Sequence, residues 1–340
     1  MNLEDVAKKA GVGTATVSRV LNGHPAVKSS TRARVLRAVE ELKYKPNLHA
    51  RSLAGGRSRV LGIVMANLYN PFFADIYHSI ETHARQCGYE ALLANSSHDV
   101  KLLKAAVHRL LGQQVAGLGV FPEMEPAILE ELREAQIPLV LFDPGAPDSH
   151  CTTIDFDHRK GMRMLVDLLH AMGHRRMAHI GAPLFLRPTE ARRLEFLDAA
   201  ARYGIESVVV TPSEDGFAGG RAAARDLLRS GFAPTAILCV NDWVAVGVIR
   251  ELRNQGLSVP EDVSVTGFDN ITISEFCCPS LTTIHIPRNE IGRLVVAGLV
   301  PDASGNPPVP RHIFLDPELV VRESTGIAPA AAAQPPSERT

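Results

Sequence analysis

The sequence has no long hydrophobic run and little cysteine. No stretch of its 340 residues approaches the ~18 apolar residues of a membrane-spanning helix, and its first residues lack the apolar core of a secretion signal. Its five cysteines are odd in number, scattered and nowhere spaced as C-x-x-C, so neither a disulfide framework nor a zinc site is indicated. We therefore expect a cytoplasmic protein in which Cys87, Cys151, Cys239, Cys277 and Cys278 are reduced and structural.

The motifs of common enzymes are missing as well. There is no G-x-G-x-x-G, G-x-x-x-x-G-K or G-x-S-x-G segment, and the 13 histidines show no H-E-x-x-H spacing. His174 and His179 fit structural roles, and Trp243 fits packing on its helix, with stacking on a ligand as the alternative. We expect no catalytic residue, metal or cofactor, although a sugar kinase or dehydrogenase on an α/β scaffold is a competing class.

Charge is distributed unevenly along the chain. The first 59 residues hold 12 Lys and Arg against 4 Asp and Glu, which is +8, so the remainder carries −9 to reach the total of −1. Such asymmetry is expected when one small domain binds a polyanion and the rest does not. The basic end is therefore the predicted DNA-binding end.

Two short apolar patterns open the chain, separated by Gly11 to Gly13. In each, apolar side chains recur every three or four residues, which predicts a helix with one buried face. These positions are Leu3, Val6, Ala7, Ala10, Val17, Val20 and Leu21. The outward face of the second helix is small, polar and basic, as entry into the DNA major groove requires, and its first turns would place Thr14, Ala15 and Arg19 against base edges. An ordinary helical hairpin is the alternative.

A third helix and a short basic segment follow. Ser29 to Thr31 offer caps for a helix that completes a small core. Pro46 ends this unit, and Asn47 can cap a short helix over 48–54. A helix of this length is unstable alone in water, so it should fold only with a partner; a plain linker is the alternative.

From Val60 onward, short apolar runs alternate with helical patterns, which predicts parallel strands joined by crossover helices. The predicted strands are 60–66, 90–94, 118–121, 139–142, 177–181, 208–210, 236–240 and 263–268. This is about twice what one doubly wound sheet needs, so we expect an α/β domain of two such subdomains side by side. A helix over 288–300 and a terminal strand in VVREST should return to the two sheets.

Polar residues follow most of the predicted strands at their carboxyl ends, where open parallel sheets bind ligands. They are Asn67, Asp143, Arg187, Asn241, Asp242 and Asp269. With Phe72 and Phe73 as apolar platforms, they would suit a hydroxyl-rich ring held between two lobes. Taken singly, each polar residue also fits the N-cap of a helix.

The N-terminal segment closely resembles the signature DVAxxAGVSxxTVSRVLN of the LacI-type (lactose/purine repressor) family of bacterial transcription regulators, through Asp5-Val6-Ala7, Ala10-Gly11-Val12 and residues 16–22. Gly13 departs from the Ser that usually caps the second helix. In the family, a leucine of a hinge helix is wedged into the minor groove, and Leu53 matches it. The implied DNA-binding residues are Leu3, Thr14, Ala15, Thr16, Ser18, Arg19, Asn22, Tyr44, Asn47, Ala50, Leu53 and Ala54.

The resemblance covers about residues 1–326 and also implies the effector contacts, through Asn70-Pro71-Phe72-Phe73, an R-x-T-x-x-x-R pattern over 187–193, Asn241-Asp242 and Gly267-Phe268-Asp269. The implied residues are Phe72, Phe73, Asp143, Arg187, Thr189, Arg193, Asn241, Asp242 and Asp269. The aromatic that covers the effector in purine and lactose regulators falls on Glu214, or on Phe217 if the loop shifts. A carboxylate there favours a sugar or sugar derivative over a purine or nucleoside, and the two arginines would tolerate a carboxylate or phosphate on that sugar.

The resemblance implies an all-α helix-turn-helix domain (1–45), a hinge helix and linker (46–58) and a periplasmic-binding-protein-like effector-binding and dimerisation domain (59–326). Its N-lobe would span about 59–157 and 288–314, and its C-lobe about 158–286 and 315–326. Residues 327–340 are low-complexity and should be disordered. We expect a ligand-responsive regulator, a repressor, that binds a pseudopalindromic operator as a homodimer. A periplasmic sugar-binding protein would share the sensor but not the basic N-terminal domain.

Overall fold

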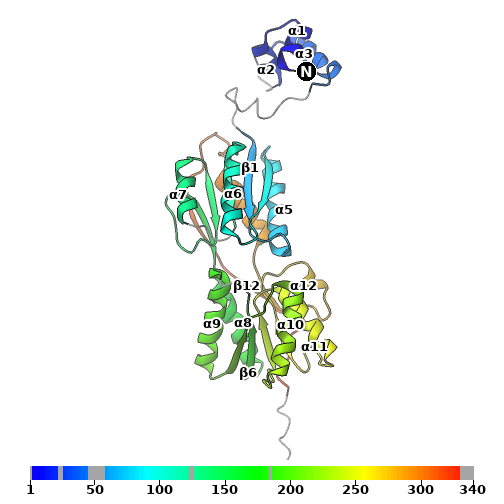
Figure 1. Ribbon diagram of the computed structural model, residues 1–340, viewed down its shortest axis with the longest axis vertical. Helices are drawn as coiled ribbons and strands as arrows, with labels where there is room; N and C mark the ends of the chain where they lie inside the picture. The colour runs from blue at the N-terminus through cyan, green and yellow to red at the C-terminus, as the bar shows by residue number, and fades with distance from the viewer. Residues whose placement is uncertain (1, 22–25, 45–57, 122–125, 184–185, 330–340) are drawn as a thin grey trace, which may run out of the picture. The chain divides into compact units, whose positions relative to one another are not determined.

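The computed structural model describes residues 2–21, 26–44, 58–121, 126–183 and 186–329. The chain divides into two compact units, Met1–Ser58 and Arg59–Thr340. The described part of the first is called the reading unit below, and that of the second the sensor (Figure 1). Within the described residues, no helix is both long and apolar enough to cross a membrane.

Three helices form the reading unit: α1 (Leu3–Ala10), α2 (Thr14–Leu21) and α3 (Ser29–Glu41). Asn2 caps α1 in a capping box with Asp5, and Gly11 ends it with a φ of 61°, which L side chains rarely adopt. The apolar faces meet in a core of small and β-branched side chains, Val6, Ala7, Ala10, Val17, Val20, Val35 and Ala38. The predicted helix-turn-helix is confirmed.

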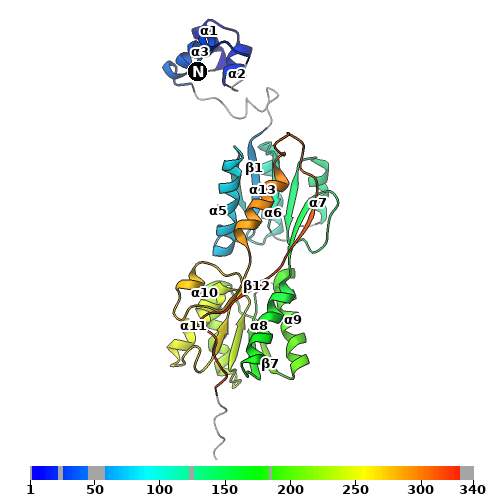
Figure 2. The ribbon, with the colours of Figure 1, turned by 180° about the vertical axis from the view of Figure 1, so that it is seen from behind.

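Six parallel strands build the sheet of the sensor's N-lobe, in the order β11-β5-β4-β3-β1-β2. They are β1 (Val60–Met65), β2 (Glu90–Asn95), β3 (Gly117–Val120), β4 (Leu139–Phe142), β5 (Thr152–Phe156) and β11 (His312–Leu315). Helices α5 (Pro71–Gln86) and α13 (Arg288–Leu299) pack side by side on one face (Figure 2). Helices α6 (Val100–Gly112) and α7 (Pro126–Glu134) cover the other face.

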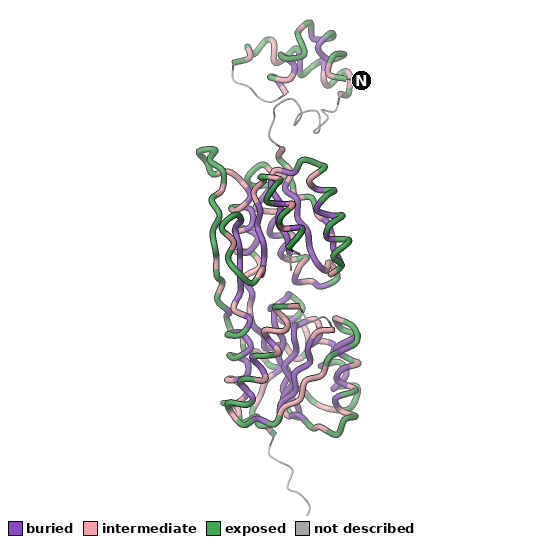
Figure 3. The backbone as a smooth tube through the Cα atoms, turned by 60° about the vertical axis from the view of Figure 1, so that its left-hand side comes forward, coloured by how far each residue is buried: buried purple, intermediate pink, exposed green. Residues whose placement is uncertain are grey.

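Four parallel strands form the sheet of the C-lobe, in the order β7-β6-β8-β9. They are β6 (Arg176–Ile180), β7 (Glu206–Val210), β8 (Ala236–Cys239) and β9 (Ser264–Thr266). Helices α8 (His158–Ala171) and α9 (Arg187–Tyr203) cover one face, and α10 (Gly216–Arg229) and α11 (Asp242–Asn254) the other. Figure 3 shows central strands buried in both lobes and the outer faces of the helices exposed. The edge strands β2, β7 and β11 are partly exposed.

Three connections join the two lobes: β5 to α8, β10 (Thr283–His285) to α13, and β11 to β12 (Glu318–Val320). Strands β10 and β12 pair antiparallel beside the C-lobe, next to the short α12 (Ile273–Phe276). A lobe pair joined by several short segments can change its relative angle while each sheet stays intact. The three connecting segments can therefore act as a hinge between the lobes.

The structure also corrects the sequence predictions. The pattern misses β5, because the segment TTIDF is polar yet fully buried, and it misses β11, the edge strand that pairs with it. Of the strand expected in VVREST, only Val320 is in a strand, since β12 ends there. All five cysteines are free thiols, but Cys87 and Cys278 are exposed, so packing does not account for these two.

Candidate functional site

The outward face of α2 carries most of the predicted DNA-reading residues that the structure describes. Thr14, Ala15 and Arg19 are exposed, and Thr16 and Ser18 are half-buried. Because Val17 and Val20 are buried in the core, the helix presents outward a face of small side chains and one basic side chain, Arg19. The face therefore has the size and chemistry for the major groove, as the sequence pattern predicts.

Two other predicted DNA contacts also serve the core. Leu3 and Tyr44 are half-buried and pack against the core of the reading unit. Each side chain is still partly exposed, so its contact with DNA stays a prediction. The predicted contacts Asn22, Asn47, Ala50, Leu53 and Ala54 lie outside the described residues.

Gly13 is placed as an N-cap of α2. Its carbonyl oxygen accepts hydrogen bonds from the amides of Thr16, at 2.9 Å, and Val17, at 3.2 Å. A Cβ atom added at Gly13 would meet no heavy atom within 4 Å. The space for a serine hydroxyl is therefore available, although this chain does not use it.

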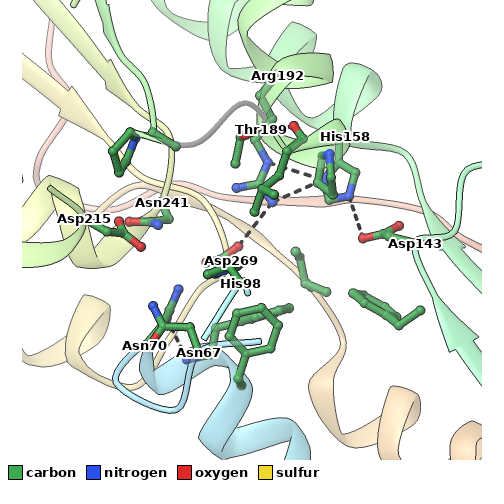
Figure 4. Close-up of a pocket in the computed structure, with 18 residues that line it drawn as sticks. Asn67, Asn70, His98, Asp143, His158, Thr189, Arg192, Asp215, Asn241 and Asp269 are labelled. Atoms are coloured by element: carbon green, nitrogen blue, oxygen red, sulfur yellow. Dashed lines mark hydrogen bonds and ion pairs between the residues drawn. The ribbon is translucent and has the colours of Figure 1, made fainter. Parts of the chain in front are cut away.

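A cavity of about 140 Å³ lies where the carboxyl ends of both sheets meet (Figure 4). An apolar cavity of ~150 Å³ holds one benzene ring, so the enclosed volume suits a single ring. Ring-bearing and aliphatic side chains form its apolar wall: Phe72, Phe73, Phe142, Ala182, Pro183, Leu186, Pro188 and Ile286. Its polar wall is formed by Asn67, Asn70, His98, Asp143, His158, Thr189, Arg192, Asp215, Asn241 and Asp269.

The apolar platform follows from the start of α5. Asn70 caps this helix by accepting the amide of Phe72 at 3.0 Å, and Pro71 occupies its first turn. This fixed turn brings Phe72 and Phe73 together, with ring centroids 5.2 Å apart at 73°. The edge-to-face pair offers an apolar face to a bound ring.

Of the predicted effector contacts, six line the cavity and three do not. Those that line it are Phe72, Phe73, Asp143, Thr189, Asn241 and Asp269. Arg187 instead donates to the carbonyl of Asp143 at 2.8 Å and to the carboxylate of Asp155 at 3.2 Å. It therefore contacts the backbone of a lining residue, Asp143, without lining the cavity itself.

Arg193 and Asp242 also lie outside the lining of the cavity. The guanidinium of Arg193 forms an ion pair with Glu190 at 2.6 Å, one turn earlier on α9. Asp242 is fully buried and accepts hydrogen bonds from Ser274 Oγ at 2.6 Å, Thr283 Oγ1 at 2.5 Å and the amide of Ile271. It ties α11 to the β10 region, so it supports the site rather than lining it.

Arg192 is the arginine that reaches the cavity. It shares the buried stripe of α9 with Glu195, Phe196 and Ala199, at helical spacings of three, four and seven residues. Arg193 lies one residue off this stripe, which is why it faces outward. A four-residue step back from the apolar Phe196 is the sequence signal that identifies Arg192.

The guanidinium of Arg192 contacts four other residues. Nη1 donates to the carbonyl of Val240 at 2.5 Å, Nε lies 3.3 Å from His158 Nδ1, and Nη2 lies 3.6 Å from Asp269 Oδ1. The group also sits 3.8 Å over the ring of Phe268, a cation–π contact. Burial of such a charge is tolerated only with partners of this kind.

His158 carries this network from the C-lobe into the N-lobe. Its Nδ1 faces Arg192, and its Nε2 lies 2.9 Å from Asp143 Oδ2 at the end of β4. Burial lowers the pKa of His158, against the opposing charge of Asp143. The imidazole is therefore neutral, accepting from Arg192 at Nδ1 and donating to Asp143 at Nε2.

Asp269 is the most perturbed carboxylate of the cavity. Burial raises its pKa to about 8, an effect that Arg192 opposes and that the negative charges of Asp242 and Asp215 reinforce. At neutral pH it therefore holds its proton for most of the time. A protonated carboxyl can both donate and accept a hydrogen bond to a ligand.

Neither residue expected at the position that covers the effector, Glu214 or Phe217, lines the cavity. Glu214 is exposed, and Phe217 packs edge-on against Trp243 with centroids 5.9 Å apart, so neither lines the cavity among the described residues. Asp215, the N-cap of α10, lines it instead. Trp243 packs on Gly216 and Phe217 as expected for a structural residue.

Several relatives share this two-unit plan. Residues 2–47 match the model of bacterial regulatory proteins of the lacI family, and residues 166–325 match a periplasmic binding protein-like domain. The HTH-type transcriptional repressor CytR of Escherichia coli (strain K12) is 33% identical over 331 residues, which cover 96% of this chain and 97% of CytR.

Solved structures of regulators also match nearly the whole chain. The lac repressor dimer bound to operator and the anti-inducer ONPF is 31% identical with a TM-score of 0.83, covering 96% of this chain and 99% of that one. A complex of the transcriptional regulator CelR with cellobiose is 30% identical with a TM-score of 0.69, covering 95% and 99%. Together with the reading unit and the interlobe cavity, these matches show that the chain belongs to the lacI family of bacterial regulatory proteins.

Proposed function

We propose that this protein represses transcription by binding a two-fold symmetric operator as a homodimer, and that a small polyhydroxylated ligand in the interlobe cavity controls this binding. The observation that carries the proposal is the convergence of polar side chains from both sheets on a ring-sized cavity with a two-phenylalanine platform. A ligand that contacts both lobes binds one hinge angle better than another, and so can shift the population of DNA-competent molecules.

The relatives support both halves of this proposal. The lac repressor structure is a dimer on operator DNA, and the CelR structure contains a sugar, cellobiose. One reading helix covers one half-site, so a dimer on a pseudopalindrome is the economical geometry for a domain of this kind. The described residues offer no group of three or more His, Cys, Asp or Glu placed to hold a metal ion.

The deciding experiment uses the full-length protein and the DNA upstream of its gene. Fluorescence anisotropy should show specific binding to a pseudopalindrome with two protein chains per site. Addition of the correct sugar should then change the affinity in one direction, weaker for an inducer or tighter for a corepressor. A monomer on DNA, or binding without sequence preference, would contradict the proposal.

A nucleoside is the second candidate effector. The Phe72–Phe73 pair offers its apolar face to a planar base as readily as to a sugar ring, and Asn67, Asn70 and Asn241 can meet a ribose. Nucleosides therefore belong in the same ligand screen. Thermal shift on the sensor ranks the two classes directly.

A further inference from the structure

The cavity is poor in available positive charge. Among its described lining residues, Arg192 is the one Lys or Arg side chain, against the carboxylic acids Asp143, Asp215 and Asp269. The guanidinium of Arg192 already contacts Val240, His158, Asp269 and the ring of Phe268. A ligand phosphate or carboxylate would have to displace one of these buried partners, leaving it without compensation.

The two other arginines expected to receive an anion are also engaged elsewhere. Arg187 donates to Asp143 and Asp155, and Arg193 pairs with Glu190. Arg288 approaches Asp269 from α13, but its guanidinium donates to the backbone carbonyls of Asp269 and Asn270 and pairs with Asp75. No arginine near the cavity therefore presents a free fork for an anion among the described residues.

Two carboxylic acids instead face the ligand space from the C-lobe. Asp269 is buried, and its Oδ1 lies 3.6 Å from Nη2 of Arg192. Asp215 uses one oxygen to accept the amide of Gly216 at 2.8 Å and lines the same wall (Figure 4). The pair is close enough for the charge of Asp215 to raise the pKa of Asp269.

From this geometry we propose that the ligand is a polyhydroxylated ring without phosphate or carboxylate, and that Asp215 and Asp269 select a ring bearing an amino group over the same ring bearing a hydroxyl. This rests on the proposed function and narrows its ligand class. An amino group supplies several N–H donors to Asp215 and Asp269, and a positive charge on it would favour the ionised form of Asp269. Asp215, which the sequence resemblance does not identify, becomes a specificity-determining residue.

The first test is a thermal-shift screen of the full-length protein with matched compounds. The sets are glucose, glucosamine, glucose 6-phosphate and glucuronate; ribose and ribose 5-phosphate; adenosine and AMP; cytidine and CMP. We expect stabilisation by uncharged or amine-bearing members and none by the phosphate or carboxylate member of the same set. A screen in which anionic members alone stabilise the protein, or in which no uncharged or amine-bearing member does, overturns the inference.

The second test uses calorimetry with the best binder and two variants. Asp215→Asn should weaken an amine-bearing ligand roughly tenfold, since a hydrogen bond to a charged group is lost, and should erase the preference for amine over hydroxyl. Glu214→Gln removes a neighbouring carboxylate that lies outside the cavity, and should change the affinity by less than about twofold. Equal effects of the two variants would contradict a specific role for Asp215.

A third test measures the proton that Asp269 releases when a ligand binds. A cationic group beside Asp269 should lower its pKa, so an amine ligand should release protons at pH 7, seen as a buffer-dependent binding enthalpy. The groups facing Asp269 are Arg192, Asp242, Arg288 and Asp215, and none of them changes in a Glu214→Gln control. If a phosphorylated compound binds and alters operator affinity, the inference fails while the proposed function stands; if operator DNA is not bound at all, the proposed function itself fails.

Discussion

The reading unit and the sensor place their charged groups in opposite environments. The Lys9–Glu41 ion pair of the reading unit leaves its side chains 42% and 49% exposed, whereas the Arg192–Asp269 pair of the sensor leaves them 7% and 5% exposed. Exposed charges act at long range, are screened by salt and suit a polyanion. Buried charges act only on what enters the same cavity, and their removal strands a partner. The two activities should therefore respond to different perturbations.

Salt gives the largest expected separation. Between 50 and 200 mM salt, operator affinity should fall roughly 10³-fold or more, because lysines and arginines release counterions from phosphates. Affinity for an uncharged ligand should change by less than about twofold over the same range. Anisotropy for DNA and calorimetry for ligand measure the two slopes, and similar slopes would break the comparison.

The second separation lies within α9. Arg192→Ala leaves Asp269, His158 and the carbonyl of Val240 without their donor, so ligand binding should weaken roughly 100-fold. Arg193→Ala removes only a partly exposed pair with Glu190 and should stay within about twofold. Calorimetry on both variants tests this, with circular dichroism and operator binding without ligand as the check on folding. A larger loss in Arg193→Ala would restore the sequence-based assignment.

The third prediction concerns Leu53, which lies outside the described residues. If it is the minor-groove wedge, Leu53→Ala should weaken specific operator binding tenfold or more, while nonspecific binding changes little, because the wedge acts only where the duplex can be kinked. Ligand affinity should be unchanged. Competition titrations with operator and random DNA decide it, and a loss below about twofold in specific affinity counts against the wedge.

The fourth prediction is a pH dependence of sensor stability. The pKa of Asp269 is raised to about 8 in the folded protein, against ~3.9 in the unfolded chain, so the folded state holds the extra proton between these values. Its contribution to stability is therefore present at low pH and is lost as pH rises from about 4 to 8, at no more than ~1.4 kcal/mol per pH unit. Denaturation of wild type and Asp269→Asn at several pH values isolates this slope. Parallel curves would show that Asp269 titrates normally.

The smallest expected effects are in the turn of the reading unit. Gly13→Ser adds an N-cap hydroxyl in open space and should stabilise α2 by a few tenths of a kcal/mol. Gly11→Ser has equal room but forces a side chain to a φ of 61°, which should destabilise the unit by roughly 1 kcal/mol. Amide hydrogen exchange of the full-length protein reports both. Opposite signs are expected, and equal signs would refute this account of the turn.

Features that depend on neighbouring residues in the chain could be predicted from the sequence, whereas features that depend on distant segments could not. Leu139 to Phe142 is recognisable as a strand because an uninterrupted apolar run needs no knowledge of its neighbours. Thr152 to Phe156 is not, because the segment is partly polar although buried, and it pairs with β4 and with β11, which is about 160 residues away in the chain. A pattern read along the sequence cannot detect such pairing.

The same limit explains why some of the expected residues do not line the cavity. Asp143, Asn241 and Asp269, expected from the strand ends, do line the cavity, because parallel sheets bring their carboxyl ends to one edge. Choosing Arg192 over Arg193 requires the orientation of α9 to within one residue, a rotation of about 100°. Choosing Asp215 over Glu214 requires the conformation of the loop that precedes α10. A motif that tolerates shifts along the chain resolves neither.

The local sequence alone determined the helix-turn-helix and its exposed basic face, the alternation of strands and helices, and the paired phenylalanines at the start of α5. Each depends on periodicity, capping or turn residues within a few positions. Only the tertiary structure decided that Arg192, His158 and Asp143 form one buried network between the lobes, and that Asp215 lines the cavity while Arg187 and Arg193 pair with other carboxylates. Those arrangements arise from contacts between segments far apart in the chain, whose energies no local pattern records.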